Sequence, residues 1–306
     1  MIKILYFGTP EISVKSLESI YNNKNFEILG VITQPDKPSG RKMEILQSPI
    51  KVFALKNKLP IIQANSKKEL YNLIKDVKAD FFVVFAYGMI ITKEILDLPK
   101  YGCINIHASL LPQYRGASPI QEALLNGDNE TGISIMAMDE KMDHGKIFLL
   151  KRIIIEGSDN VETLSKQIAE TAAEMIPYAL IDIKNKLLTG IVQDESKATY
   201  CKKIEKKDGN IDFNKKVSKI LNQIRAYKNW PTSYFIFKNK KITVISAEIS
   251  DEKVEKGEIT IINNKIIAGA KDGSLNILQL KMEGKKECSS KDFINGYKDF
   301  FAPQNL

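Results

Sequence analysis

Three polar side chains in the middle of the chain have the types that acyl transfer requires. Asn105 and His107 stand two positions apart at the end of the apolar stretch "CINIH", and Asp143 follows a second apolar stretch. Residues two apart on a strand share a face, so the amide and the imidazole should project side by side. An amide N–H and a charged imidazole can stabilise an oxyanion, while a nearby carboxylate orients the ring and favours its charged form. The trio therefore predicts acyl transfer from a good donor to an amine, without a serine or cysteine nucleophile.

A structural role for these residues is the competing interpretation. A single histidine is more often part of a core than of a site, but His107 is expected at the carboxyl end of a strand, where ligands bind in open α/β sheets. His144, the only other histidine in the chain, adjoins Asp143 and could compete for the role. We expect it to turn the opposite way and lie on the surface. For Cys103, on the same strand, core packing is expected.

Short apolar stretches alternate with amphipathic ones through the first half of the chain, which indicates a mostly parallel, Rossmann-like α/β sheet covered on both faces. The strands expected there are Ile2–Phe7, Ile28–Thr33, Phe81–Phe85, Cys103–Ile106 and Gly132–Met138. The helices expected between and after them are Ile12–Tyr21, Ile50–Lys58, Ile120–Leu125 and, with a kink or break at Pro177, Val161–Lys186. Thr9-Pro10, Ser48-Pro49 and Ser118-Pro119 each have the hydroxyl-then-proline pattern of a helix start. The turn after the first strand lacks a GxGxxG motif, so a bound NAD is not expected.

The last third of the chain has a different pattern. One helix near 216–227 is followed by short strands at close spacing, broken by Asn and Gly turns, which predicts a small OB-like β-barrel. The predicted domains are 1–188 (catalytic, Rossmann-like), 189–206 (a polar, lysine-rich linker) and 207–306 (the OB-like barrel).

Charge divides the chain in the same way. The net charge is +8, and residues 206–306 alone carry 19 basic against 12 acidic side chains. A solvated lysine-rich surface and a binding face for a polyanion are both open interpretations. Three scattered cysteines without a CxxC motif argue against disulfides and structural zinc. No apolar run approaches the roughly 20 residues that span a bilayer, and no signal peptide is evident, so we expect a cytoplasmic protein that does not contact membranes.

Several motifs in this order resemble the folate-dependent formyltransferases over nearly the whole chain. They are "NIH" (105–107), "SLLP" (109–112), "RG" (115–116), "DHG" (143–145), "FGTPEISVKSLESI" (7–20), "TQPDKPSGR" (33–41), "SPIKVFA" (48–54), "VVFAYGMII" (83–91) and "NWP" (229–231). The resemblance implies 10-formyltetrahydrofolate as the donor, with no metal, and the methionine amino group of initiator methionyl-tRNA as the acceptor. It also implies the catalytic roles of Asn105, His107 and Asp143, and we expect a monomer.

The resemblance also implies where the two substrates bind. The folate is expected against Ser109, Leu110, Leu111, Pro112, Tyr87, Gly88, Ile90, Ile91 and Asp139. The tRNA is expected at Arg41 and Lys42 in the loop over 35–47, and at Lys206 and Lys207. Loop packing is the competing interpretation for Leu110 and Leu111, and a solvated flexible loop for 35–47.

Three other functions stay open. The chain could formylate a nucleotide sugar or glycinamide ribonucleotide, it could hydrolyse formyl-folate, or it could bind RNA without catalysis. The basic C-terminal third argues against the first, and the Asn–His–Asp set argues against the last.

Overall fold

The computed structural model describes residues 1–39, 44–297, 300 and 301. The chain divides into two compact units, each formed by several segments. The first unit comprises 1–119, 130–154 and 165–201, and the second comprises 120–129, 155–164 and 202–306. Residues 189–201, which fall in the predicted linker, are part of the first unit. The predicted domain boundaries stay a prediction.

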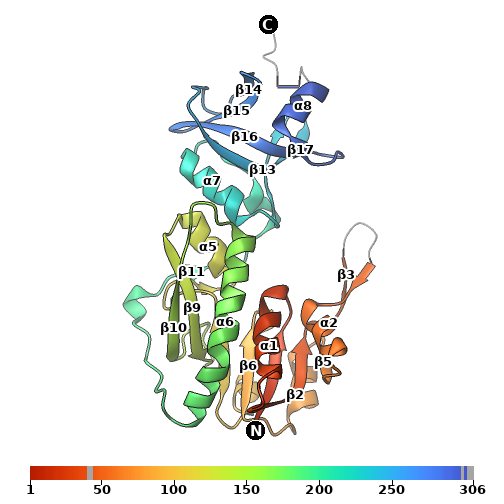
Figure 1. Cartoon of the computed structure of the whole chain (residues 1–306), viewed down its shortest axis with the longest axis vertical. Coiled ribbons are helices and arrows are strands. Elements are labelled where there is room, and N and C mark those ends of the chain that lie inside the picture. The colour runs from red at the N-terminus through yellow and green to blue at the C-terminus, as the bar shows by residue number, and fades with distance from the viewer. Residues whose placement is uncertain (40–43, 298–299, 302–306) are drawn as a thin grey trace. The chain divides into compact units, whose positions relative to one another are not determined.

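The first unit is built on a seven-stranded sheet, as far as the described residues go. Its order is β10-β9-β7-β6-β1-β2-β5, and the strands from β7 to β5 are parallel. The strands are β1 (Ile2–Gly8), β2 (Phe26–Thr33), β5 (Ile61–Gln63), β6 (Phe81–Phe85), β7 (Cys103–His107), β9 (Glu130–Ala137) and β10 (Ile147–Ile154). The predicted Rossmann-like, mostly parallel sheet is confirmed (Figure 1).

Helices cover both faces of this sheet because the central strands are apolar on both sides. On β1, Leu5 and Phe7 pack in one cluster with the buried leucines and isoleucines of α3 (Lys67–Ile74) and α4 (Lys93–Leu96). The alternate residue Tyr6 is also buried, and its hydroxyl donates to the Ser13 carbonyl at 2.7 Å. A strand whose alternating residues are buried on both faces is typical of a layered α/β fold.

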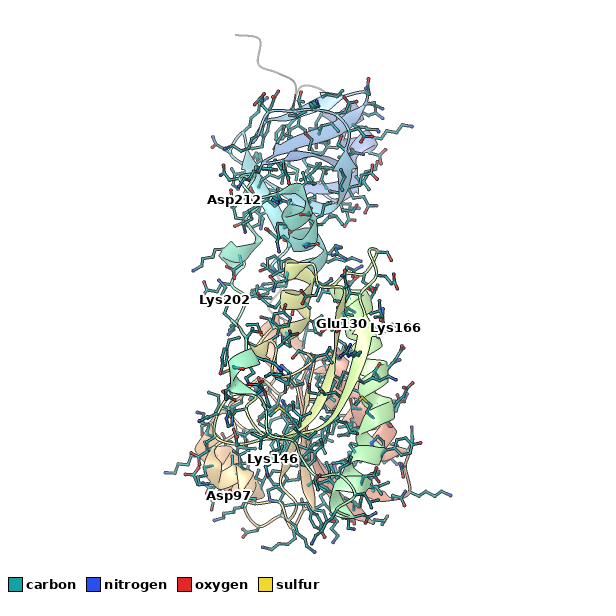
Figure 2. All side chains as sticks on the ribbon, turned by 90° about the vertical axis from the view of Figure 1, so that its left-hand side faces the viewer. Asp97, Glu130, Lys146, Lys166, Lys202 and Asp212 are labelled. Carbon is teal, nitrogen blue, oxygen red and sulfur yellow. The ribbon has the colours of Figure 1, made fainter. Side chains whose placement is uncertain are left out.

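Two helices lie side by side against the sheet, α1 (Val14–Tyr21) and α6 (Val161–Lys184) (Figure 1). Lys15 Nζ bonds Glu170 at 2.6 Å, and Ser19 Oγ donates to the Ala173 carbonyl at 2.6 Å. Charged residues of α6 such as Lys166 point outward (Figure 2).

Proline does not interrupt α6. The helix runs through Pro177, so the predicted break there is wrong. A proline removes one backbone N–H from a helix, but the neighbours Ile176, Ala179 and Leu180 are fully buried. Their packing against the sheet holds the helix on both sides of the proline.

Of the predicted helix starts, Ser48 is confirmed. Its hydroxyl accepts from the Lys51 N–H at 3.2 Å, and α2 (Pro49–Lys56) follows. At Thr9-Pro10 the prediction is wrong, because a short 3₁₀ turn (Glu11–Ser13) forms there and the Thr9 hydroxyl donates instead to the Tyr87 carbonyl at 2.9 Å. The third predicted helix, α5, spans Pro119–Asn126.

The second unit contains an antiparallel sheet in the order β12-β13-β16-β15-β14, with β17 beside β16. The strands are β12 (Ser233–Phe237), β13 (Lys240–Ser250), β14 (Ile259–Ile262), β15 (Lys265–Ala270), β16 (Gly273–Met282) and β17 (Cys288–Ser289). The register of β13 against β16 shifts around Ser246, and such irregularities bend a strand. The predicted C-terminal β domain is confirmed as an antiparallel sheet, and the described part of residues 202–306 adds the helices α7 (Val217–Ala226) and α8 (Ser290–Gly296).

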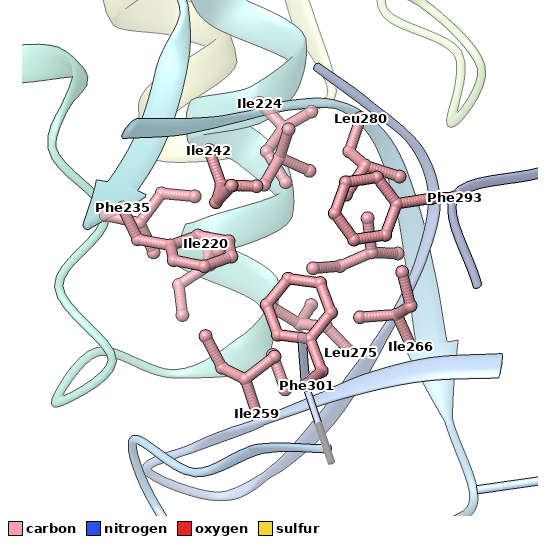
Figure 3. Packing of buried hydrophobic residues seen from close by; sticks show 14 of the residues in the cluster. Ile220, Ile224, Phe235, Ile242, Ile259, Ile266, Leu275, Leu280, Phe293 and Phe301 are labelled. Carbon is pink, nitrogen blue, oxygen red and sulfur yellow. The ribbon is translucent and has the colours of Figure 1, made fainter. Parts of the chain in front are cut away.

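Figure 3 shows the hydrophobic core of this second unit. Ile220 and Ile224 of α7 point into the sheet, where they meet Phe235 and Ile242. Phe293 of α8 packs against Phe301, with ring centroids 5.4 Å apart. This separate core gives the second unit its own basis for stability.

Candidate active site

The interior strand β7 positions two of the three predicted catalytic side chains. Asn105 and His107 lie on the same face of β7, in register with Met136 and Ser134 of β9. Asn105 is 9% exposed and His107 is 5% exposed. Polar groups this deep need hydrogen-bond partners, so their contacts define what they can do.

Asp143 reaches this face from the loop between β9 and β10. Its Oδ1 accepts from Asn105 Nδ2 at 3.3 Å, and its Oδ2 lies 3.7 Å from His107 Nδ1. Oδ2 also accepts from the Gly116 N–H at 2.8 Å. The predicted trio therefore converges around one carboxylate, whose side chain is 16% exposed.

The path of the loop that brings Asp143 to His107 is not evident from the sequence. β9 is antiparallel to β7, so its carboxyl end at Ala137 lies beside Ile104, near the amino end of β7. The loop must turn back toward His107, and Asp143 has φ +49° within it. Positive φ is uncommon outside glycine, so contacts from elsewhere must hold the loop in this shape.

Both ring nitrogens of His107 face acceptors. Nε2 lies 2.9 Å from the Tyr114 carbonyl, and a carbonyl can only accept, so Nε2 carries a proton. Nδ1 faces the Asp143 carboxylate. A ring protonated at both nitrogens would donate to both groups, and a proton at Nδ1 would lie between the imidazole and the carboxylate.

Sequence reasoning missed two residues that surround this centre, Arg115 and Gln193. Arg115 is 1% exposed and donates to Gln193, Tyr200 and both oxygens of Glu195. The Glu195 contact raises the pKa of the guanidinium, and Arg115 lowers the pKa of the Glu195 carboxyl. The signal in the sequence was the arginine of the "RG" pair, but nothing there pointed to residues near 193.

The predicted folate loop after β7 is held by its own contacts. Ser109 is fully buried and donates to the Gln113 carbonyl at 2.6 Å. The Leu111 N–H donates to Ser134 Oγ at 3.0 Å, and the Leu111 side chain is buried. Leu110 and Pro112 are partly exposed. These hydrogen bonds give the loop a fixed shape, which agrees with a packing role for its residues. A contact between this loop and the folate stays a prediction.

The second predicted folate segment follows β6 and divides between core and surface. Tyr87 and Ile91 are buried in the cluster that also contains Cys103, whereas Gly88 is exposed and Ile90 is 67% exposed. Burial raises the pKa of Tyr87 to about 12. Within the described residues its hydroxyl meets no hydrogen-bond partner, which is costly for a buried polar atom.

Asp139 borders a hollow of about 440 Å³ beside the Asp143 loop. Its carboxylate is 2.7 Å from His144 Nδ1, so His144 is paired rather than directed freely outward. The floor of the hollow includes Leu96, Cys103 and Met138, and charged residues at its edge include Asp97, labelled in Figure 2. Among the predicted folate residues, only Asp139 lines it.

The predicted tRNA residues lie far apart in the chain. Lys206 and Lys207 are exposed, and Lys207 Nζ pairs with Glu205 at 2.7 Å. Arg41 and Lys42 lie outside the described residues.

Metal ligation and membrane insertion find no support in the described part of the chain. There, no group of three or more His, Cys, Asp or Glu side chains is placed to hold a metal ion. Within the same residues, no helix has both the length and the apolar character needed to cross a membrane.

Two family models match the chain. The formyl transferase model matches residues 2–180, and the model of the formyl transferase C-terminal domain matches residues 203–298.

Curated relatives match over nearly their full length. The methionyl-tRNA formyltransferase of Caldicellulosiruptor saccharolyticus is 43% identical over 303 residues, covering 96% of this chain and 97% of its own. That of Dictyoglomus thermophilum is 42% identical over 306 residues, covering 97% of each chain.

Solved structures share the fold. WlaRD, a sugar 3N-formyl transferase crystallised with dTDP and 5-N-formyl-THF, is 25% identical with a TM-score of 0.69, over 94% of this chain and 99% of its own. HypX from Aquifex aeolicus, in complex with tetrahydrofolic acid, is 14% identical with a TM-score of 0.66, over 97% of this chain and 47% of its own.

Proposed function

The chain belongs to the methionyl-tRNA formyltransferases of the formyl transferase family, and we propose that Asn105, His107 and Asp143 form its catalytic centre. It transfers a formyl group from 10-formyltetrahydrofolate to the amino group of methionine on initiator methionyl-tRNA. The observation that carries the assignment of residues is the convergence of the amide, the imidazole and the Gly116 N–H on the two oxygens of Asp143.

Each member of the trio has a distinct task in this proposal. The neutral methionine amine attacks the formyl carbon, and Asn105 and His107 stabilise the negative charge that develops on the formyl oxygen. When the bond between that carbon and N10 of the folate breaks, N10 takes a proton from His107, directly or through water, and the proton that the attacking amine loses returns to His107. Asp143 orients the amide and the imidazole. Because both ring nitrogens of His107 face acceptors in the structure, the Tyr114 carbonyl and Asp143, one of these contacts is exchanged for the substrate during the reaction.

The donor is proposed to lie along the face of β7 that carries Asn105. The segments predicted for it are 109–112, Tyr87–Ile91 and Asp139, of which Asp139 alone lines the hollow beside the Asp143 loop. Its apolar floor at Cys103 and Met138 suits a flat ring, and Cys103 shares a cluster with Tyr87. The Tyr87 hydroxyl, which meets no partner among the described residues, is a buried polar group that a heterocycle could satisfy.

The tRNA is proposed to contact Lys206 and Lys207, with Arg41 and Lys42 as further contacts. Exposure of both lysines and the basic excess of residues 206–306 support this. A monomer and a cytoplasmic location belong to the same proposal, and sedimentation of the purified protein tests the first.

One assay separates this function from its alternatives. Purified protein is incubated with 10-formyltetrahydrofolate and one acceptor at a time: initiator methionyl-tRNA, an amino sugar linked to a nucleotide, glycinamide ribonucleotide, or none. We expect formyl transfer to the methionyl-tRNA alone. Transfer to another acceptor would assign a different formyltransferase, release of formate without an acceptor would indicate a hydrolase, and tRNA binding without turnover would leave only an RNA-binding protein.

A further inference from the structure

We propose that Gln193 is a positioning residue for Asp143, acting together with Arg115. This inference rests on the proposed catalytic role of Asp143. Gln193 lies in the stretch that the sequence predicts to be a linker, yet it is 6% exposed and belongs to the first unit.

The side-chain amide of Gln193 donates hydrogen bonds to the backbone on both sides of His144. Nε2 donates to the Asp143 carbonyl and to the Gly145 carbonyl, each at 2.8 Å. Since a carbonyl only accepts, the orientation of the amide is fixed by its partners. Asp143 has the positive φ that needs outside support, and these two bonds supply it.

The other end of the same amide is held by Arg115. Gln193 Oε1 accepts from Arg115 Nε at 3.1 Å and Nη2 at 2.8 Å. The guanidinium is fixed in turn by Glu195, with Nη1 to Oε2 at 3.0 Å and Nη2 to Oε1 at 2.6 Å. Every polar atom of the Gln193 amide therefore has a partner, although the side chain is buried.

Arg115 also links the hydrogen bonds of Gln193 to the carboxylate of Asp143. The next residue, Gly116, donates its N–H to Asp143 Oδ2. The parallel pairing of β8 (Arg115–Gly116) with β11 (Tyr200–Cys201) holds both residues in place. Gln193 thus fixes the backbone of Asp143. Gly116, which follows Arg115 in the chain, fixes the Asp143 side chain.

Two substitutions separate positioning from folding. Gln193→Leu removes all four bonds of the amide at nearly constant volume. Gln193→Glu keeps the acceptor for Arg115 but replaces the two donated bonds with a carboxylate oxygen facing two carbonyls. We expect both to lower kcat by about 10²-fold, the cost of a misplaced catalytic group, without changing the KM for tRNA.

A matched control exists in the second unit. Gln223 is 3% exposed, and its Nε2 likewise donates to two backbone carbonyls, those of Gly209 at 3.2 Å and Asn210 at 3.3 Å. Gln223→Leu should lower the melting temperature and leave kcat at saturating substrates unchanged. A similar loss of kcat in this variant would overturn the proposal, because any lost buried amide would then have the effect.

The deciding experiment is a double-mutant cycle with Asp143→Asn. If Gln193 acts through Asp143, Gln193→Glu should lower kcat strongly in the native background and very little in the Asp143→Asn background. Equal losses in both backgrounds, or unchanged kcat in the single variant, would contradict positioning. Full activity of Asp143→Asn alone would instead contradict the proposed catalytic centre, so the two failures are distinguishable.

Discussion

The backbone N–H of Gly116 donates a hydrogen bond of 2.8 Å to Oδ2 of Asp143, the same oxygen that lies 3.7 Å from His107 Nδ1. A main-chain group thus fixes the carboxylate that serves both catalytic donors. This contact depends on a backbone path that only glycine follows easily.

Gly116→Ala tests that path. Gly116 has φ +122°, and a Cβ added there would lie 2.2 Å from the Cys201 carbonyl oxygen. The backbone must shift, so we expect a loss of about 1–3 kcal/mol in the free energy of unfolding together with a large drop in kcat. Urea denaturation and steady-state formylation measure the two effects.

Gly284→Ala is the matched control for Gly116→Ala. Gly284 also has positive φ, +76°, but among the described residues no atom lies within 4 Å of the place that an added Cβ would take. It should lose some stability and keep normal kcat. If Gly116→Ala has the activity of this control, the contact between Gly116 and Asp143 is not needed for catalysis.

The buried thiol of Cys103 should take no part in the chemistry. Burial raises its pKa well above the usual range of a thiol, so at pH 7–8 the group is protonated and a poor nucleophile. We expect iodoacetamide to leave Cys103 unmodified in the native protein at pH 8 and to alkylate it in urea, as followed by peptide mass spectrometry.

Activity of Cys103→Ala completes that test. Because Cys103 lines the hollow beside Asp139, the KM for the folate can change, but kcat should stay near that of the native enzyme. Loss of kcat to background would mean that the thiol reacts and that direct attack by the methionine amine, without a cysteine nucleophile, is wrong.

Acid should weaken the contact that holds Arg115. Arg115 lowers the pKa of Glu195, so the folded state binds the Glu195 proton less tightly than the unfolded state. The stabilising contribution is fully present above the ordinary glutamate pKa of about 4.3, and it is lost as the pH falls through the lower folded value. Glu195→Gln should therefore unfold at lower urea concentration than the native protein at pH 7.

The quantity to measure is the difference in urea midpoint between the native protein and Glu195→Gln. It should shrink as the pH falls from 7 toward 3, because protonated Glu195 resembles glutamine. A difference that is constant over this range would show that the charge of Glu195 contributes nothing through Arg115.

Salt should separate the two substrates. Lysines that neutralise tRNA phosphates release counterions, so the affinity for tRNA should fall steeply between 50 and 200 mM salt, as is general for such contacts. The donor is expected against a partly apolar hollow, and its affinity should barely change. Replacing Lys206 and Lys207 by glutamine should reduce the slope for tRNA, and equal slopes for both substrates would contradict the electrostatic role.

Much of the fold could be predicted because the core strands are apolar on both faces. β1, β6 and β7 are buried along almost their whole length, and continuous apolar stretches of that kind are recognisable in a sequence. Short or amphipathic elements were missed. Examples are α3 (Lys67–Ile74) and β10 (Ile147–Ile154), whose exposed residues leave a weak pattern, and β5 (Ile61–Gln63), whose three residues are all partly buried.

Local geometry in the sequence predicts the pair Asn105 and His107, whereas Asp143 was predicted from its place after an apolar stretch and from the family resemblance. Asn105 and His107 stand two apart on one strand, so their shared face follows from strand geometry. The position of Asp143 depends on a loop that turns back beside an antiparallel strand, and the position of Gln193 depends on a stretch whose polar composition suggested a linker. Long-range backbone contacts of this kind leave no local pattern in the sequence.

The central claim is that Asn105 and His107 stabilise the transition state of formyl transfer. The most direct test is the kcat for formylation of initiator methionyl-tRNA by purified Asn105→Ala and His107→Ala, with melting temperature and folate affinity measured alongside. Loss of one oxyanion donor typically costs about 10²–10³ in rate, so each variant should lose at least that much while remaining folded and able to bind folate. Near-normal turnover in either folded variant would contradict the account.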